Sequence, residues 1–378
     1  MAGASMAGAS MAGAADKMDK PFRVISTGLR GGRANIAFDQ ALIEARQENK
    51  IPDTIRFLRF RPCALIGIHQ FLSHELKLDY CRANGIETVR RITGGGALYF
   101  DEGQIGWELV FDRATLGLSD LGEVTRRICE AAALGLQKLG VPARYRPRND
   151  IEVDGRKISG TGGFFDGNLI FYQGTLLVDF DPMKMLACLH VPADKLMKHA
   201  INSAAQRVIT MREVLGGVPD FENIYRSLVN GFAEGLGIIP LWGEITAHEE
   251  ELAARAYRDE IGTDEFVRML DAPPKDDTHV TASLTGRGGT VRADIRLEGR
   301  HRERIREALI TGDFFIAPPR VVFDLESSLR GLSVADAGPA VDAFFAAHPT
   351  DFLSLSADDF RRVIELALRE CNQAPVYN

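Results

Sequence analysis

Two glycine-rich segments contain residues whose types and spacing could bind and transfer an acidic group. In the first, RRITGGGALYFD at residues 90–101, an arginine pair on an expected strand precedes three consecutive glycines. Glycine has no Cβ, so its backbone N–H groups can approach a ligand closely, and an arginine at the strand end can fork onto phosphate or carboxylate oxygens. Taken alone, a glycine triplet is more often a flexible turn after a strand.

The second segment, NDIEVDGRKISGTGG at residues 149–163, places Lys157 on an expected hairpin between polar turn residues and another glycine-rich turn. A lysine ammonium can neutralise charge that builds on a transferring phosphoryl or acyl oxygen, and Asp150 could orient it or accept a proton from an incoming amine. Taken singly, the lysine is more often a solvated hairpin residue and the aspartate a turn or cap residue.

The elements around these segments predict the fold class. Apolar residues recur at helical spacing over residues 34–48 and 120–139, with Ser119 as the expected N-cap of the second helix. The segments TIRFLRF, ALIGI, ETVRRI, IGWELVF, DIEVDG and NLIFYQGTLLVDF read as strands, and D-G turn signals favour antiparallel hairpins. We expect an α+β fold with a mixed, mostly antiparallel sheet flanked by helices.

The chain is expected to divide into two domains behind a disordered tail. The repeated MAGAS unit within residues 1–20 is too poor in large apolar groups to pack. Residues 21–272 form the first domain, and APPKDD, with two prolines and three charges, is typical of a linker, placed at residues 273–278. Residues 279–378 then read as a smaller α+β unit.

Composition and charge disfavour several classes of function. The 45 basic and 52 acidic residues give a net charge of -7, so no basic excess favours nucleic acid or an anionic membrane. No apolar run reaches the length of a membrane span. The five cysteines show no metal-ligand spacing and are typical of free thiols in a reducing compartment, which predicts a cytoplasmic protein.

Together, the two segments resemble the lipoate-protein ligase family. RRITGGGALYFD is similar to the family's R-R-x-[ST]-G-G-G-A-x-x-x-D signature, and NDIEVDGRKISG to its N-D-[IL]-x-[VL]-x-G-[RK]-K-[IV]-S-G segment. ALIGIHQ, FYQGTLLVDFD and INSAAQRVITMREV are similar to further segments of the family, and TGDFFIAPPRVVFDLESSLRG resembles its accessory domain. The resemblance covers nearly the whole chain after the tail.

The resemblance implies a catalytic domain of the class II synthetase and biotin ligase type with a C-terminal accessory domain. The implied reaction has two steps: lipoate attacks the α-phosphate of ATP in the presence of Mg²⁺, and an acceptor lysine then attacks the acyl-adenylate. It implies catalytic roles for Lys157, Asp150 and Arg91. The residues expected to bind ATP or the acid are Arg91, Thr93, Gly94, Gly95, Gly96, Ala97, Asn149, Lys157, Ser159, Gly174, Thr175 and His69.

Five residues near the expected site are open to interpretation. Phe100 and Gln173 stand where many relatives have histidines, and because phenylalanine cannot hydrogen-bond, acyl specificity or rate could differ here. Ile66 and Leu98 either line the acyl channel or pack in the core. His69 could serve as a base, although a single histidine at a strand end is more often structural.

Three alternative functions remain. An octanoyl transferase of the same fold needs a cysteine in the loop before the N-D strand, and GVPARYRPRND contains none, while Cys129 and Cys188 read as core residues. A biotin ligase normally carries a G-R-G-R-x-G type loop in place of R-R-x-T-G-G-G. A noncatalytic scaffold that binds lipoyl domains would have no need of Arg91, the glycine triplet and Lys157 together.

The resemblance also implies a partner. The acceptor is expected to be a glycine-cleavage H protein, an E2 lipoyl domain or a specialised lipoate-binding protein, and the sequence does not distinguish among these or between lipoate and octanoate. We expect a monomer, with no nucleic acid or membrane partner. The accessory domain is expected to close over the site during adenylation and to swing away for the acceptor.

Overall fold

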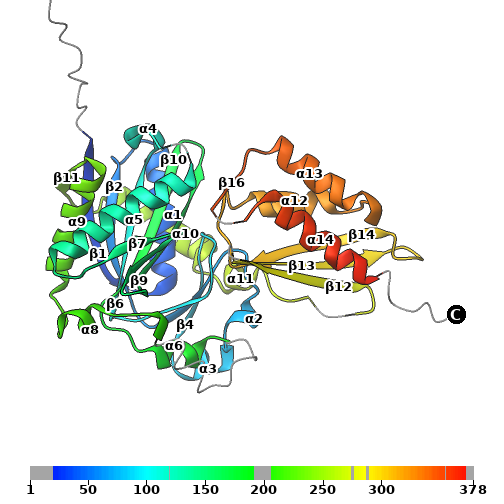
Figure 1. The fold of residues 1–378 in the computed structure, drawn as a ribbon, viewed down its shortest axis with the longest axis horizontal. Coiled ribbons are helices and arrows are strands. Elements are labelled where there is room, and N and C mark those ends of the chain that lie inside the picture. The colour runs from blue at the N-terminus through cyan, green and yellow to red at the C-terminus, as the bar shows by residue number, and fades with distance from the viewer. Residues whose placement is uncertain are drawn as a thin grey trace, which may run out of the picture.

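The chain forms two neighbouring bodies of secondary structure, which Figure 1 shows with the larger one in blue to yellow-green and the smaller one in yellow to red. The computed structural model describes residues 20–118, 120–190, 206–273, 276–286, 289–353 and 355–371. The smaller body begins at β12 (His279–Gly286), just after the expected linker. Each body has a hydrophobic core of its own.

An eight-stranded sheet forms the larger body, in the order β11-β1-β2-β6-β10-β9-β8-β7. Only the pairings of β1 with β11 and β2 are parallel, and every other neighbouring pair is antiparallel. The expected mixed, mostly antiparallel sheet is therefore confirmed. Its strands are β1 (Pro21–Arg30), β2 (Thr54–Phe60), β6 (Gln104–Asp112), β7 (Arg144–Arg146), β8 (Asp150–Val153), β9 (Arg156–Asp166), β10 (Leu169–Leu177) and β11 (Ile239–Trp242).

Different helices cover the two faces of this sheet. Side chains alternate between the faces of a strand, so the two neighbours Arg56 and Phe57 on β2 point to opposite sides. The Phe57 ring stacks on Tyr225 of α9 (Phe221–Leu236), which packs against α5 (Leu121–Lys138). Arg56 instead bonds to Asp39 of α1 (Gly32–Gln47). The α1 face is the one that also carries the candidate site.

A small second sheet, in the order β4-β3-β5, completes the larger body. Its central strand β3 (Cys63–Ile66) pairs in parallel with β4 (Glu87–Arg90) and antiparallel with β5 (Leu98–Phe100). The glycine triplet lies in the connection between β4 and β5. The remaining helices of this body are α2 (Leu72–Glu75), α3 (Leu78–Ala83), α4 (Arg113–Leu116), α6 (Pro182–Cys188), α8 (Met211–Leu215), α10 (Ala247–Ala256), a π-helical turn (Tyr257–Ile261) and α11 (Asp264–Arg268).

The smaller body is the α+β unit expected from the sequence. An antiparallel sheet in the order β12-β13-β14 is packed by helices, with α14 lying across β12 and β13. A two-stranded pair, β15 with β16, lies on the side that faces the larger body (Figure 1). The elements after β12 are β13 (Gly289–Glu298), β14 (Arg304–Gly312), β15 (Ile316–Ala317), α12 (Val321–Leu329), a short 3-10 turn (Val334–Asp336), α13 (Ala337–Ala347), β16 (Asp351–Phe352) and α14 (Ala357–Cys371).

Two sequence expectations about helix ends can be compared with the structure. The helix expected over residues 34–48 begins two residues earlier, at Gly32. The expected cap Ser119 lies outside the described residues, and the side chain that caps α5 is Asp120, which accepts a hydrogen bond of 2.9 Å from the backbone N–H of Glu123. Among the described helices, none is long and apolar enough to cross a membrane.

Candidate active site

A cavity of about 280 Å³ lies on the α1 face of the large sheet, between that sheet and the small sheet. Both glycine-rich segments reach it, one through the β4–β5 connection and the other through β9. Its apolar lining includes Ile36, Leu58, Phe60, Leu65, Leu98 and Phe100. Its polar lining includes Arg91, Glu108, Asn149, Lys157, Gln173 and Thr175. A site that is mostly apolar, with a few charged groups, suits an acid with an apolar tail.

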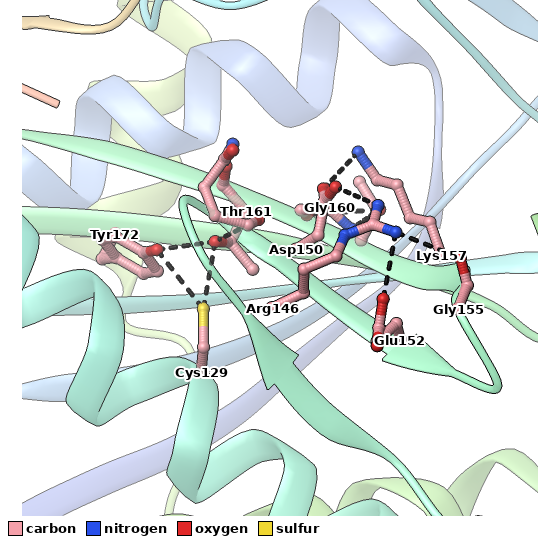
Figure 2. Close-up of polar contacts among 11 residues, drawn as sticks. Cys129, Arg146, Asp150, Glu152, Gly155, Lys157, Gly160, Thr161 and Tyr172 are labelled. Carbon is pink, nitrogen blue, oxygen red and sulfur yellow. Dashed lines mark hydrogen bonds and ion pairs between the residues drawn. The ribbon is translucent and has the colours of Figure 1, made fainter. Parts of the chain in front are cut away.

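The centre of the polar lining is Lys157, which Figure 2 shows beside Asp150 and Arg146. Lys157 Nζ lies 2.8 Å from Asp150 Oδ1, and Arg146 Nη2 lies 2.6 Å from Asp150 Oδ2, so each carboxylate oxygen has its own cation. Arg146 is itself held by Glu152 at 3.0 Å and by the carbonyl of Gly155 at 3.1 Å. The lysine therefore stands at the end of a fixed chain of ion pairs.

The electrostatics of Asp150 follow from these contacts. Burial alone would raise the pKa of its carboxyl group, but Lys157 and Arg146 together lower the pKa below its ordinary value. Asp150 is consequently ionised at neutral pH and serves better to hold Lys157 than to take up a proton.

Local strand geometry explains why Lys157 faces the cavity. The register of β8 and β9 shifts between Ile151 and Glu152, which is a bulge that re-aims the strand at this point. The backbone carbonyl of Lys157 also accepts a hydrogen bond of 2.9 Å from Ile209. The lysine backbone is thereby held from both sides while its side chain is about one third exposed.

The two arginines of the first segment have different roles. Arg90 is fully buried and donates to five backbone carbonyls, among them those of Gly67 and Leu270, so it fixes the loops around the site. Arg91 lines the cavity and donates through Nη2 to the carbonyls of Gly94 and Gly96, each at 3.0 Å.

Arg91 also carries an unused donor. Its Nη1 is buried and has no hydrogen-bond partner among the described residues, and burial lowers the pKa of its guanidinium to about 10. A buried N–H group without a partner is costly. Because Arg91 is a cation at the cavity wall with one donor still unpaired, the site fits a phosphate or a carboxylate.

The glycine triplet contacts the smaller body of the protein. The N–H of Gly95 donates to the carbonyl of Phe314 at 3.0 Å, and a Cβ at Gly94 would lie 2.2 Å from that same oxygen. The ring of Phe315 lies over Gly95 and Gly162, where added Cβ atoms would be 2.5 Å and 2.1 Å from it. Glycine is needed at these positions because the loop before β15 packs directly onto their backbone.

Several residues expected at the site line the cavity: Arg91, Gly94, Gly95, Gly96, Asn149, Lys157, Gly174 and Thr175, together with Leu98, Phe100 and Gln173. Three other expected residues lie behind its wall. Thr93 is buried and accepts a hydrogen bond of 2.7 Å from Gln173, Ser159 is buried, and Ala97 packs in a side cluster with Ile66. They support the wall and do not contact the space inside it.

The expected place of His69 in the substrate site needs correction. Its ring is buried between Phe314 at 5.2 Å and Phe323 at 5.3 Å, away from the cavity lining. Burial, and next to it the charge of Arg90, lower the pKa of His69 to about 3. Its backbone carbonyl accepts from the N–H of Gly312 at 2.9 Å. The histidine therefore belongs to the contact between the two bodies, which supports its structural interpretation.

Sequence reasoning missed several cavity residues, among them Glu108 and Phe315. Glu108 belongs to IGWELVF, and the lone acid in this otherwise apolar strand was a usable signal, because a buried carboxylate needs a partner. Phe315 gave no such signal, since nothing in GDFF indicates that the loop reaches another domain.

Four of the cysteines are buried and do not line the cavity. Cys63, Cys81, Cys129 and Cys188 are all free and buried. Cys129 is drawn in Figure 2 beside Thr161 and Tyr172, at 3.2 Å and 3.6 Å, and its burial raises the pKa of the thiol to about 11. A thiol with such a pKa is almost entirely protonated at neutral pH and reacts slowly.

Comparison with known proteins gives consistent matches. Residues 32–233 match the sequence model of the lipoyl protein ligase A/B catalytic domain. The octanoyltransferase LipM of Kyrpidia tusciae is 28% identical over 256 residues, which are 61% of this chain and 93% of that protein. A crystal structure of lipoate-protein ligase A bound with ATP is 26% identical, with a TM-score of 0.57 over 67% of this chain and 100% of that chain. The structure of P. falciparum LipL1 in complex with lipoate has a TM-score of 0.69 over 92% of this chain and 99% of that chain. At 16% sequence identity, this likeness shows a common fold alone.

Proposed function

Because the chain belongs to the lipoyl protein ligase A/B catalytic domain family, we propose that it is an ATP-dependent lipoate-protein ligase that activates lipoate and joins it to a lysine of an acceptor protein. One observation carries the proposal: Arg91 and Lys157, two cations from the two glycine-rich segments, line the same largely apolar cavity. This combination suits an acyl chain whose carboxylate becomes bonded to a phosphate.

In the first step, a carboxylate oxygen of lipoate attacks the α-phosphorus of ATP, and the bond to the pyrophosphate oxygen breaks. Negative charge grows on the phosphoryl oxygens, where Arg91 supplies a guanidinium donor and Lys157 an ammonium. Asp150 keeps the ammonium in place through their ion pair of 2.8 Å. The product is the lipoyl-adenylate.

In the second step, the amine of the acceptor lysine attacks the acyl carbonyl and AMP leaves. Lys157 neutralises charge on the carbonyl oxygen and on the departing phosphate. Asp150 acts as a positioning residue in this step, since its pKa is lowered and both of its oxygens are occupied by cations.

The bond between Gly95 and Phe314 gives the accessory body a role in nucleotide binding. The N–H of Gly95 is available to a phosphate only when it no longer donates to the carbonyl of Phe314. Nucleotide binding at the glycine triplet is therefore expected to displace the loop that carries Phe314 and Phe315, a movement opposite to the closure during adenylation that was expected from the sequence.

Mg²⁺ is expected to reach the site together with ATP. Among the described residues, no group of three or more His, Cys, Asp or Glu side chains could hold a metal ion. Mg²⁺ commonly binds through substrate phosphates and retains several water ligands, so a dedicated protein cage is unnecessary.

An octanoyl transferase is the second candidate, because LipM of Kyrpidia tusciae is among the relatives. A transferase that forms an acyl-enzyme needs a reactive thiolate beside Lys157. The loop before β8 contains no cysteine, and Cys63, Cys81, Cys129 and Cys188 are buried. These observations favour the ligase over the transferase.

The acceptor is proposed to be an H protein, an E2 lipoyl domain or a specialised lipoate-binding protein. The proposal is tested by supplying free lipoate and an E2 lipoyl domain with and without ATP, and following the lipoyl amide by mass spectrometry. The ligase forms the amide only with ATP. Transfer from an octanoyl-loaded carrier protein in the absence of ATP would instead establish the transferase.

A further inference from the structure

Arg146 lies outside both glycine-rich segments, yet it contacts the carboxylate that holds Lys157 (Figure 2). It belongs to β7, the edge strand of the large sheet, and its direct partner in the pairing with β8 is Asp150. Arg146 Nη2 lies 2.6 Å from Asp150 Oδ2, and Arg146 Nη1 lies 3.0 Å from Glu152 Oε2. The hydrogen bond to Asp150 is the largest cause of a raised pKa of this guanidinium. One arginine thus bridges two carboxylates beside the cavity.

The ammonium of Lys157 depends on Asp150 for its place. Within the described residues, Asp150 is the only ion-pair partner of this ammonium. A Cβ at Gly160 would lie 2.4 Å from Lys157 Nζ, so the ammonium lies directly over the backbone of that glycine. A lysine side chain has a flexible four-carbon stem, and this one is about one third exposed. A change in the direction of the Asp150 carboxylate would therefore move the ammonium.

Arg146 acts on this arrangement in two ways, both through Asp150. Its guanidinium is also held by Glu152 and by the carbonyl of Gly155 at 3.1 Å, so it fixes the direction of the Asp150 carboxylate. It also leaves Asp150 with a cation when Lys157 turns toward negative charge that develops on a substrate oxygen. A largely buried carboxylate without any cation is costly. With Arg146 in place, the ammonium changes partner without leaving such a charge behind.

Resting on the proposed function, we infer that Arg146 is a positioning residue for adenylation, which holds Asp150 so that Lys157 reaches the developing charge. Arg144, two residues away on the same strand, provides the contrast. It lies 2.8 Å from Glu152, which is its only ion-pair partner in the described part of the chain. The role therefore belongs to one of the two arginines of β7 and does not follow from the basic character of this sheet edge.

The test measures kcat and KM for adenylate formation as pyrophosphate release. Arg146→Leu is expected to lower kcat by roughly tenfold to a hundredfold and to leave the KM for lipoate within about twofold, because it misplaces a charge that acts in the transition state. Arg146→Lys keeps a cation beside Asp150 and recovers most of kcat. Arg144→Leu is the matched control, with kcat within about twofold of wild type. Equal rates of Arg146→Leu and Arg144→Leu would overturn the inference.

A double-mutant cycle tests the route through Asp150. In an Asp150→Asn background, Arg146 has no carboxylate to hold. Adding Arg146→Leu to that variant should therefore lower kcat by less than about twofold, although the same change slows the wild-type enzyme strongly. Independent effects that multiply in the double variant would show that Arg146 acts by another path, and would overturn the assigned role.

The outcomes separate this inference from the proposed function. If the wild-type enzyme forms no adenylate, the ligase proposal is wrong and the inference fails with it. If adenylate forms and Arg146→Leu keeps the wild-type kcat, only the role of Arg146 is wrong. Circular dichroism shows whether each variant is folded. Should Arg146→Leu not fold, Arg146→Gln, which keeps a polar side chain without the charge, must show the loss of kcat, and a wild-type kcat there overturns the inference.

Discussion

The ammonium of Lys157 lies 2.8 Å from one oxygen of Asp150, while Arg146 occupies the other oxygen at 2.6 Å. Because both carboxylate oxygens are taken, Asp150 holds the lysine in one place. The ion pair joins β8 to β9. Lys157 is the only charged residue of the second glycine-rich segment that lines the cavity, and Arg91 lines the same cavity. This arrangement is the basis of the first two predictions.

Replacement of Lys157 by alanine is expected to slow adenylation by roughly a hundredfold to a thousandfold, the usual cost of losing one group that stabilises transition-state charge. The fold should persist, since the side chain is about one third exposed. Pyrophosphate release and circular dichroism check both statements. Lys138→Ala, at an exposed ion pair with Glu234, is the matched control and should retain full activity. Near-normal turnover of the Lys157 variant would refute its assigned role.

The ion pair of Asp150 predicts how stability depends on pH. Its folded-state pKa is lowered from 3.8, so the stabilisation is fully present above that value and is lost as the pH falls through the folded-state pKa. The difference in unfolding free energy between wild type and Asp150→Asn should therefore be constant from pH 5 to 8 and shrink only below about pH 4. Urea unfolding at several pH values measures it. A difference that already declines between pH 7 and 5 would contradict the lowered pKa.

Much of the fold was readable from the sequence, because alternating and helical apolar patterns report directly on burial. The strand at IGWELVF was predicted and is β6, and the lysine hairpin was predicted and is formed by β8 and β9. Arg91 and Lys157 were expected at one site, and both line the cavity. The strands depend on local sequence, and the two residues of the site belong to glycine-rich motifs that could be recognised together.

The features that escaped prediction depend on contacts between distant segments. His69 belongs to a domain contact because Phe314 stacks on it, and the two residues are 245 positions apart in the chain. The buried ionic cluster of Asp39, Arg56 and Glu108 forms because α1 crosses the sheet beside Arg56. Periodicity within one segment contains no information on such pairings.

The contact of Phe315 with Gly95 and Gly162 predicts a gain in nucleotide affinity when the ring is removed. The N–H of Gly95 donates to the carbonyl of Phe314, which lies in the same loop as Phe315. ATP must therefore displace this loop before it can bind that N–H group. Phe315→Ala weakens the hold of the loop and should tighten ATP binding by about twofold to tenfold, since less free energy is needed to reach the competent state. Isothermal titration calorimetry measures the affinity, with Tyr257→Ala at an exposed aromatic as control. Unchanged or weaker binding would mean that the loop does not compete with ATP.

The buried state of Cys129 predicts that this cysteine takes no part in the reaction. Its pKa of about 11 keeps the thiol protonated, and its sulfur contacts only Thr161 and Tyr172 among polar groups of the described residues. Cys129→Ala should cost at most a few kcal/mol of stability and leave ATP-dependent lipoylation within about twofold of wild type. A loss of a hundredfold or more, with the fold intact, would support an acyl-cysteine intermediate.

The most direct measurement of the central claim is adenylate formation in the absence of acceptor. The purified protein is incubated with ATP, Mg²⁺ and lipoate, lipoyl-adenylate is sought by mass spectrometry, and pyrophosphate is followed by a coupled assay. We predict stoichiometric lipoyl-adenylate with matching pyrophosphate, both formed roughly a hundredfold to a thousandfold more slowly by Lys157→Ala. Absence of adenylate from the wild-type protein, together with acyl transfer from a loaded carrier protein without ATP, would contradict the ligase and establish the transferase.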